Sequence, residues 1–182
     1  MPIIPPALTG CAGEHFVAYR LSAMGYLVAL TRGGSPTVDL MVGTPDGKKM
    51  VTIQVKTKNK AFSPATKKDP ISCWYWQVAA KAKEPPGERF LYAFVNLKGG
   101  AGESPKPMPM PEVFIVPADF VAEKMNQALA GSTKNERTSW VSVYGKPPTM
   151  FFFHIEAGQD GMEKDVEKKW RENWDLIKER LG

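Results

Sequence analysis

The sequence predicts an α/β protein in which helices pack against a mixed β-sheet. Residues 9–24 carry an apolar stripe at helical spacing, residues 50–58 alternate apolar and polar side chains, and residues 89–97 form a nearly continuous apolar run. These patterns are typical of a helix packed on one side, a half-buried strand and a strand buried on both faces. The order helix, three strands, helix, strand indicates an α/β sandwich.

The helix expected over residues 9–24 carries a carboxylate on its apolar side. Four apolar residues recur on one face of this helix: Val17, Ala18, Leu21 and Met24. Glu14 lies three and four residues before the first two of them, so it shares their face at its N-terminal end. Gly25 is a natural stop for the helix. Because burying an unpaired charge is costly, we expect Glu14 either to lie in water at the rim or to have a cation or metal partner.

Three strands are predicted after this helix, over residues 26–32, 38–42 and 50–58. Residues 33–36 form the first turn, and the Pro-Asp-Gly sequence at 45–47 is a strong signal for the second. So tight a connection makes the second and third strands antiparallel neighbours.

The third strand presents two chemically different faces. One face is apolar and carries Val51, Ile53, Val55 and Thr57, and the other is polar and carries Thr52, Gln54, Lys56 and Lys58. Successive side chains of a strand point to opposite faces, so Gln54 and Lys56 point the same way. Asp39, in the neighbouring strand, can lie beside Gln54.

The middle of the chain is predicted to continue with a loop, a helix and a strand. Residues 59–70 read as a basic loop and residues 72–83 as a short helix. The apolar run at 89–97 is a fourth strand, and residues 99–111, rich in proline and glycine, are a loop.

The last third of the chain predicts further elements around the same core. Residues 113–116 form a fifth strand that leads into a helix over about 118–129, and residues 140–144 and 150–155 pair as late strands. From residue 162 onward the spacing predicts one amphipathic helix docked on the domain. Its apolar residues recur at intervals of three and four: Val166, Trp170, Trp174, Ile177 and Leu181.

Length and composition place these elements in a single domain. The chain has 182 residues, of which 43% are hydrophobic and 24% charged, which is a globular balance. We expect one domain over 1–182, with a core at about 9–98 and a C-terminal elaboration at about 112–182. No apolar run is long enough for a membrane span and the N-terminus is not a secretory signal, so we expect a cytoplasmic protein. Cys11 and Cys73 have no metal-binding spacing and are expected to be free thiols.

Basic residues concentrate in one stretch of the chain. The net charge is +5, and seven lysines and no acid lie between Lys48 and Lys68. Such a local positive field attracts phosphates, although a solvated loop with lysines kept for solubility is an equal alternative. The residues expected to bind nucleic acid are Arg32, Lys58, Lys60, Lys67 and Lys68.

Four residues near the second and third strands fit the chemistry of phosphodiester hydrolysis. That reaction is assisted by a divalent metal held by oxygen ligands and by a fixed cation near the scissile phosphate. Asp39 supplies a carboxylate, Gln54 a side-chain carbonyl and Val55 a backbone carbonyl, while Glu14 completes or orients the set. Lys56 is the cation. The expected metal is Mg²⁺ or Mn²⁺.

In this arrangement the chain resembles the PD-(D/E)xK nuclease superfamily, which has the restriction-endonuclease-like fold. The resemblance covers about Gly13 to Leu97 and rests on Gly13-Glu14, on residues 37–40 and on the sequence Ile-Gln-Val-Lys-Thr at 53–57. It implies an αβββαβ core, a four-stranded mixed sheet flanked by helices, followed here by a C-terminal extension. Asp39, Gln54 and Lys56 match the core positions of the superfamily.

The remainder of the chain is similar to small uncharacterised proteins predicted to be such nucleases. The matching parts are Trp76, residues 90–97, residues 113–117 and the closing sequence at 170–176. Two positions depart from the superfamily pattern. Val38 stands where a proline is usual, and Gln54 replaces an acid, which removes one negative charge from the metal site.

Three functions are compatible with these observations. The first is a metal-dependent endonuclease acting on DNA, which we expect to be a homodimer if it cuts both strands. The second, favoured by Gln54, is a catalytically weak or inactive nucleic-acid-binding module on the same fold. The third is a protein-interaction subunit. Other candidate groups favour ordinary structural roles: His15 and His154 as surface or core residues, residues 74–76 as core aromatics and residues 33–35 as a plain turn.

Overall fold

The computed structural model describes residues 5–31, 37–67, 71–84, 86–99, 109–130, 150–158 and 164–182. Its helices are α1 (Pro6–Ala23), α2 (Ala118–Ala130), α3 (Asp165–Trp170) and α4 (Asp175–Leu181), with a 3-10 helix η1 (Ala80–Lys83). Its main sheet contains β1 (Leu27–Leu30), β2 (Leu40–Gly43), β3 (Met50–Lys58), β6 (Phe90–Asn96) and β7 (Glu112–Pro117). A second sheet contains β4 (Phe62–Ser63), β5 (Cys73–Ala79) and β8 (Met150–Glu156).

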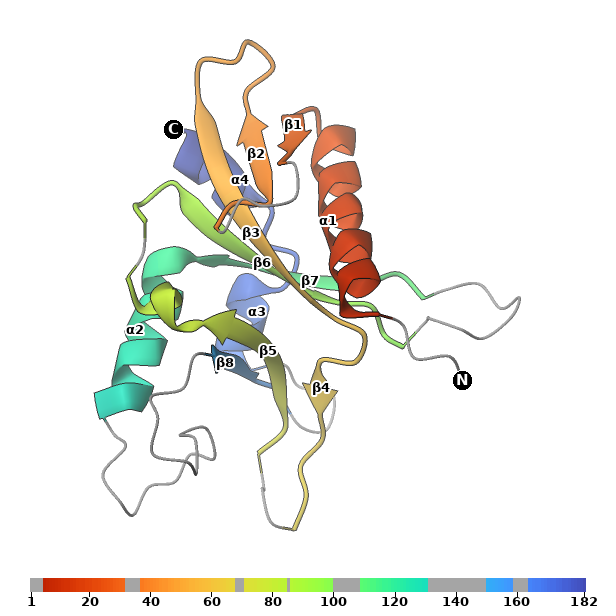
Figure 1. Ribbon diagram of the computed structural model, residues 1–182, viewed down its shortest axis with the longest axis vertical. Coiled ribbons are helices and arrows are strands. Elements are labelled where there is room, and N and C mark those ends of the chain that lie inside the picture. Colours follow the sequence, from red (N-terminus) through yellow and green to blue (C-terminus); the bar gives the residue numbers. More distant parts are fainter. Residues whose placement is uncertain are drawn as a thin grey trace.

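The predicted mixed sheet flanked by helices is confirmed, with five strands in place of four (Figure 1). The strand order is β1-β2-β3-β6-β7, and the first three strands form the antiparallel meander that the turn signals predict. β3 then pairs with β6 in parallel and β6 with β7 antiparallel. β3 begins and ends at the residues predicted from its alternating pattern.

Two layers of different composition cover the two faces of this sheet. α1 packs along β1, β2 and β3 (Figure 1), and its Val17 and Leu21 are fully buried. On the other face, Phe94 of β6 contacts Trp76 of β5, with ring centroids 5.3 Å apart, and stacks on Phe153 of β8 at 4.7 Å. The second sheet therefore covers the face of the main sheet that carries Gln54 and Lys56.

The helix predicted over residues 72–83 is wrong: β5 occupies most of this segment and η1 ends it. Trp74, Trp76 and Val78 are buried while Gln77 is exposed, which is the period-two alternation of a strand. Aromatic and β-branched side chains favour such a half-buried pleated surface. Antiparallel pairing with β8 along the whole of β5 supplies the backbone hydrogen bonds.

The single C-terminal helix predicted from residue 162 is also wrong, because α3 and α4 are separate helices. Between them Arg171 forms a β-bridge to Phe114, and Glu172 adopts a left-handed backbone with φ of 51°. That conformation is unfavourable for a non-glycine residue and interrupts the helix. Val166 is correspondingly exposed, while Glu167 is buried.

Some predicted elements fall outside the described residues. These are the turn at 33–36, the strand at 140–144 and most of the loop at 99–111. Among the described strands, β8 pairs with β5. No helix in the described part of the chain has the length and hydropathy needed to span a membrane.

Candidate active site

Asp39 and Gln54 meet where β2 separates from β3. The register pairs Leu40 with Ile53, so the next residues, Asp39 and Gln54, stand opposite each other. The Asp39 N–H donates to the Ile53 carbonyl at 2.9 Å, and the Asp39 carbonyl accepts from the Thr31 N–H at 2.9 Å. The backbone of Asp39 is thus fixed from β3 on one side and from the end of β1 on the other.

The Asp39 side chain occupies the edge of β3 that β2 leaves open. Its Oδ2 accepts a hydrogen bond from the Val55 N–H at 2.7 Å. The pairing of β2 with β3 ends at Ile53, so the following edge of β3 has no neighbouring strand among the described residues. The N–H and C=O of one strand residue point to the same side. The Val55 carbonyl therefore faces this open edge together with the Asp39 carboxylate.

Gln54 and Lys56 lie on the same face of β3, as predicted. Gln54 is 6% exposed, and its amide forms no hydrogen bond within the described part of the chain. Lys56 is half-buried. Burial lowers the pKa of its ammonium group, and the nearby Asp39 and Glu14 carboxylates oppose that effect.

Glu14 reaches the same site from α1. Gly13 lies directly against Thr57 of β3, where an added Cβ would stand 1.9 Å from the Thr57 Oγ1, so the helix approaches the strand closely at this point. Burial raises the pKa of Glu14, and the charge of Asp39 raises it further, while His15 and Lys56 lower it. Glu14, Asp39 and Lys56 thus influence one another electrostatically, although they come from α1, from the segment before β2 and from β3.

The pKa of Asp39 is also above its ordinary range. Burial raises this pKa, whereas the hydrogen bond from the Val55 N–H and the positive charges of Lys56 and Lys81 lower it. A cation bound between two carboxylates that both have raised pKa values would stabilise their charged forms.

Lys81 lies near this candidate site, although the sequence does not predict it there. It is exposed on η1 and donates from Nζ to the Thr37 Oγ1 at 3.2 Å. Its charge acts on both Asp39 and Lys56. No local motif marks it, because it enters the site only through the path of β5, which was predicted as a helix.

The residues predicted to bind nucleic acid have different surroundings. The Lys58 Nζ lies over the Tyr75 ring, 2.9 Å from its centroid. Lys60 and Lys67 are exposed, whereas Arg32 and Lys68 lie outside the described residues. The two histidines have ordinary local contacts: His15 Nδ1 lies 2.9 Å from the Cys11 carbonyl, and the His154 ring stacks on Tyr75.

The donor set suits a hard divalent cation better than a soft one. Two carboxylates, the Gln54 amide and the Val55 carbonyl offer only oxygen ligands, which Mg²⁺ prefers. Among the described residues, no group of three or more His, Cys, Asp and Glu side chains is arranged to hold a metal ion. Beside the two acids, the neutral carbonyl groups of Gln54 and Val55 are the oxygen donors that this site offers a metal.

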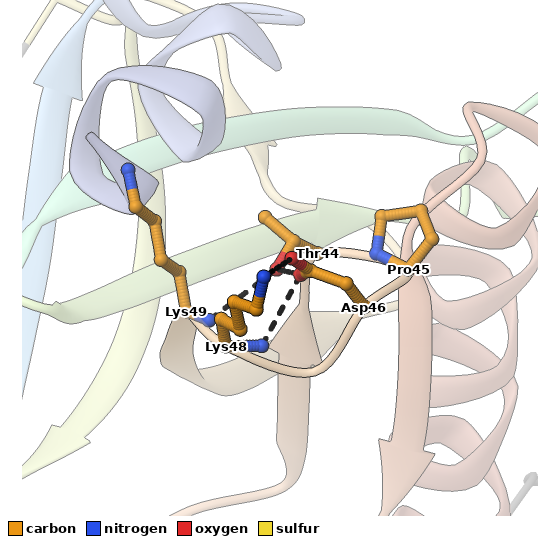
Figure 2. Close-up of a pocket in the computed structure, with 5 residues that line it drawn as sticks. All are labelled: Thr44, Pro45, Asp46, Lys48 and Lys49. Carbon is orange, nitrogen blue, oxygen red and sulfur yellow. Dashed lines mark hydrogen bonds and ion pairs between the residues drawn. The ribbon is translucent and has the colours of Figure 1, made fainter.

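A hollow at the β2–β3 turn is distinct from this site. It is lined by Thr44, Pro45, Asp46, Lys48 and Lys49 (Figure 2). The Thr44 hydroxyl donates to Asp46 at 2.5 Å, and the Lys48 ammonium pairs with the same carboxylate at 3.4 Å. These groups satisfy one another within the turn, at the far end of β2 and β3 from Asp39.

Comparison with known proteins supports the fold. No protein-family model matches the chain, and no curated protein matches it. A solved structure, that of the bacterial homing endonuclease I-Ssp6803I, is similar to it with a TM-score of 0.53 and 14% sequence identity. The match covers 95% of this chain and 93% of that one. The mixed sheet with its flanking helices is therefore a fold that also occurs in an endonuclease.

Proposed function

We propose that this protein is a metal-dependent endonuclease that hydrolyses phosphodiester bonds in DNA, as a member of the PD-(D/E)xK superfamily. The observation that carries the proposal is the meeting of Asp39, Gln54 and Lys56 at the open edge of β3, with Glu14 electrostatically coupled to them. The similarity to a homing endonuclease structure agrees with it.

The residues have distinct roles in this proposal. Asp39, Gln54, the Val55 carbonyl and Glu14 would hold Mg²⁺ or Mn²⁺. When bound, such a cation polarises the phosphate and lowers the pKa of the attacking water. The Val55 N–H keeps the Asp39 carboxylate in place. Lys56 offsets the negative charge that grows on the phosphate oxygens as the water oxygen bonds to phosphorus and the ester bond breaks.

Cleavage of supercoiled plasmid in Mg²⁺, Mn²⁺ or EDTA tests the proposal. We expect nicked or linear product only with metal, and loss of product in Lys56→Ala and in Asp39→Asn. Lys178→Ala is the control, because this lysine is exposed on α4. Cleavage that survives in both site variants would exclude this site, and cleavage that survives in EDTA would exclude the metal.

A binding module without catalysis is the second candidate, and Gln54 favours it. With glutamine at this position, the described site holds only two acidic side chains, Glu14 and Asp39. Metal affinity falls as ligand charge is removed, because a neutral amide attracts a divalent cation less than a carboxylate does. Here DNA binding should be salt-sensitive and independent of Mg²⁺. Gln54→Glu distinguishes the candidates, since added metal affinity should strengthen cleavage in a nuclease.

A further inference from the structure

Lys81 brings a second positive charge to the candidate site from a segment other than α1 and the β2–β3 region, which carry the other residues. It lies on η1, which follows β5 of the second sheet. Its ammonium group contacts Thr37, two residues before Asp39. Asp39 is fixed on β3 through Ile53 and Val55, so the contact joins Lys81 to the site through a short and well-held segment.

The contact at Thr37 also lies beside a hollow. Thr37 and Val38 line one side of it, and Thr52, Arg89, Phe90 and residues 86–88 line the rest. Its volume is about 510 Å³, which is within the range of sites that hold a small organic group. Arg89 is exposed at this hollow. Lys81 therefore contacts a residue, Thr37, that lines this hollow together with a further cation, Arg89.

The net charge of the candidate site depends on Lys81. Glu14 and Asp39 contribute two negative charges, and Lys56 and Lys81 contribute two positive ones. Before any metal binds, the site is close to neutral, so a DNA phosphate is not repelled from it. The Lys81 side chain is exposed and donates to the neutral Thr37 hydroxyl. A phosphate can compete with this hydroxyl for the ammonium group, because a charge-assisted hydrogen bond is stronger.

We propose that Lys81 binds the DNA phosphate next to the one that faces Lys56, and so positions the strand for cleavage. This inference rests on the proposed function. It makes Lys81 a substrate-binding residue supplied by η1, the 3-10 helix that follows β5. It also assigns the hollow at Thr37 to the nucleotide attached to that phosphate.

Lys81→Ala tests the inference, with Lys83→Ala as a matched control. Lys83 is exposed on the same 3-10 helix and pairs with Glu84 at 3.8 Å. DNA affinity is measured in EDTA over a range of salt concentrations, and cleavage is measured as kcat and KM. Removing one phosphate contact should reduce the slope of log affinity against log salt by about 0.9 in Lys81→Ala. KM should rise several-fold with little change in kcat, while Lys83→Ala behaves as wild type.

Two further measurements separate this role from a structural one. Lys81→Arg keeps the charge and should restore the salt slope. Lys81→Ala should also bind Mn²⁺ more tightly in the absence of DNA, since a positive charge near Asp39 is removed. A merely structural lysine would weaken DNA and metal binding together, through a loss of folding that circular dichroism detects.

Different results would contradict the role of Lys81 and the proposed nuclease function. An unchanged salt slope and KM in Lys81→Ala, with wild-type cleavage that Lys56→Ala abolishes, would overturn the role of Lys81 alone. Wild-type protein that neither cuts nor binds DNA would overturn the proposed function as well.

Discussion

Gly13 of α1 lies against the side chain of Thr57 of β3, so closely that no larger residue fits between helix and strand. A Cβ at Gly13 would stand 1.9 Å from the Thr57 Oγ1, 2.8 Å from its Cγ2 and 2.9 Å from its Cβ. The contact joins the residue before Glu14 to the residue after Lys56. The position of Glu14 relative to Lys56 thus depends on glycine, which has no side chain, at position 13.

Gly13→Ala is expected to destabilise the protein by about 1–3 kcal/mol, because overpacking forces the helix or the strand to shift. Alanine in a helix interior would otherwise stabilise by up to about 1 kcal/mol. Gly10→Ala, in the same helix with nothing within 4 Å of its added Cβ, should show only that gain. Denaturant unfolding of both variants measures the difference.

A second substitution at Thr57 tests the cause of this effect. Thr57→Ala removes two of the three close atoms, so it should recover part of the stability lost in Gly13→Ala. The double variant should also recover cleavage that Gly13→Ala loses through displacement of Glu14. If Gly13→Ala and Gly10→Ala have equal stability, α1 does not approach β3 as closely as described.

Glu167 holds together the C-terminal helix α3 and the second sheet. Its buried carboxylate accepts from the Trp74 Nε1 at 2.9 Å, from the Gly158 N–H at 2.9 Å and from Arg171. Burial alone would raise its pKa, but these hydrogen bonds outweigh it, so the pKa of Glu167 is lowered. Its contribution to stability is present above its unfolded pKa and is lost as pH falls through the folded value.

Glu167→Gln should therefore lower the free energy of unfolding by about 3 kcal/mol, which is the lower end of the range for breaking a buried ion pair. The lower end is expected because Arg171 keeps its second partner, Glu112, at 2.7 Å. Glu179→Gln, at an exposed position of α4, is the control and should change little. Thermal unfolding at pH 7 and at pH 4 provides the measurement. A penalty that is no smaller at pH 4 would contradict the lowered pKa.

Local patterns predicted most of the main sheet. The alternation over residues 50–58 and the turn at 45–47 define β3 and its pairing with β2, and that register brings Asp39 to Gln54. The sequence wrongly predicts a helix over residues 73–79, because Trp74 and Val78, four residues apart, also fit one face of a helix. What makes them a strand is β8, more than seventy residues further along the chain.

The arrangement of the candidate site could be predicted only where local sequence patterns determine it. Asp39, Gln54 and Lys56 follow from strand register, and Glu14 follows from the carboxylate on an apolar helix face. Lys81 could not be predicted, since the long-range pairing of β5 brings it to Thr37. The break between α3 and α4 likewise depends on the bridge from Arg171 to Phe114, which belongs to a distant strand.

Exposed lysines after β3 should control DNA affinity. Lys60 and Lys67 are exposed, and each phosphate contact contributes about 0.9 to the slope of log affinity against log salt. Lys60→Ala combined with Lys67→Ala should lower that slope by up to about 1.8, measured by fluorescence anisotropy with duplex DNA. Lys178→Ala on α4 is the control. A slope equal to that of wild type would assign these lysines to solubility.

Asp39→Asn is expected to stabilise the metal-free protein at neutral pH while it abolishes cleavage. Burial raises the pKa of Asp39 in the folded state. The folded protein therefore binds this proton more tightly than the unfolded chain, and stability falls as pH rises from the unfolded pKa to the folded one. Asparagine removes this loss, and its amide oxygen can still accept from the Val55 N–H.

Thermal unfolding of wild type and Asp39→Asn in EDTA between pH 4 and pH 8 measures the effect. The variant should melt increasingly above wild type as pH rises from about 4, the ordinary pKa of an aspartate. The proposed metal site exists only in the folded state, so we expect Mg²⁺ at 100 times its Kd to raise the free energy of unfolding of wild type by about 2.7 kcal/mol and that of the variant not at all. A difference in melting temperature that stays constant with pH would contradict the raised pKa of Asp39. A response to Mg²⁺ in Asp39→Asn would place the metal elsewhere.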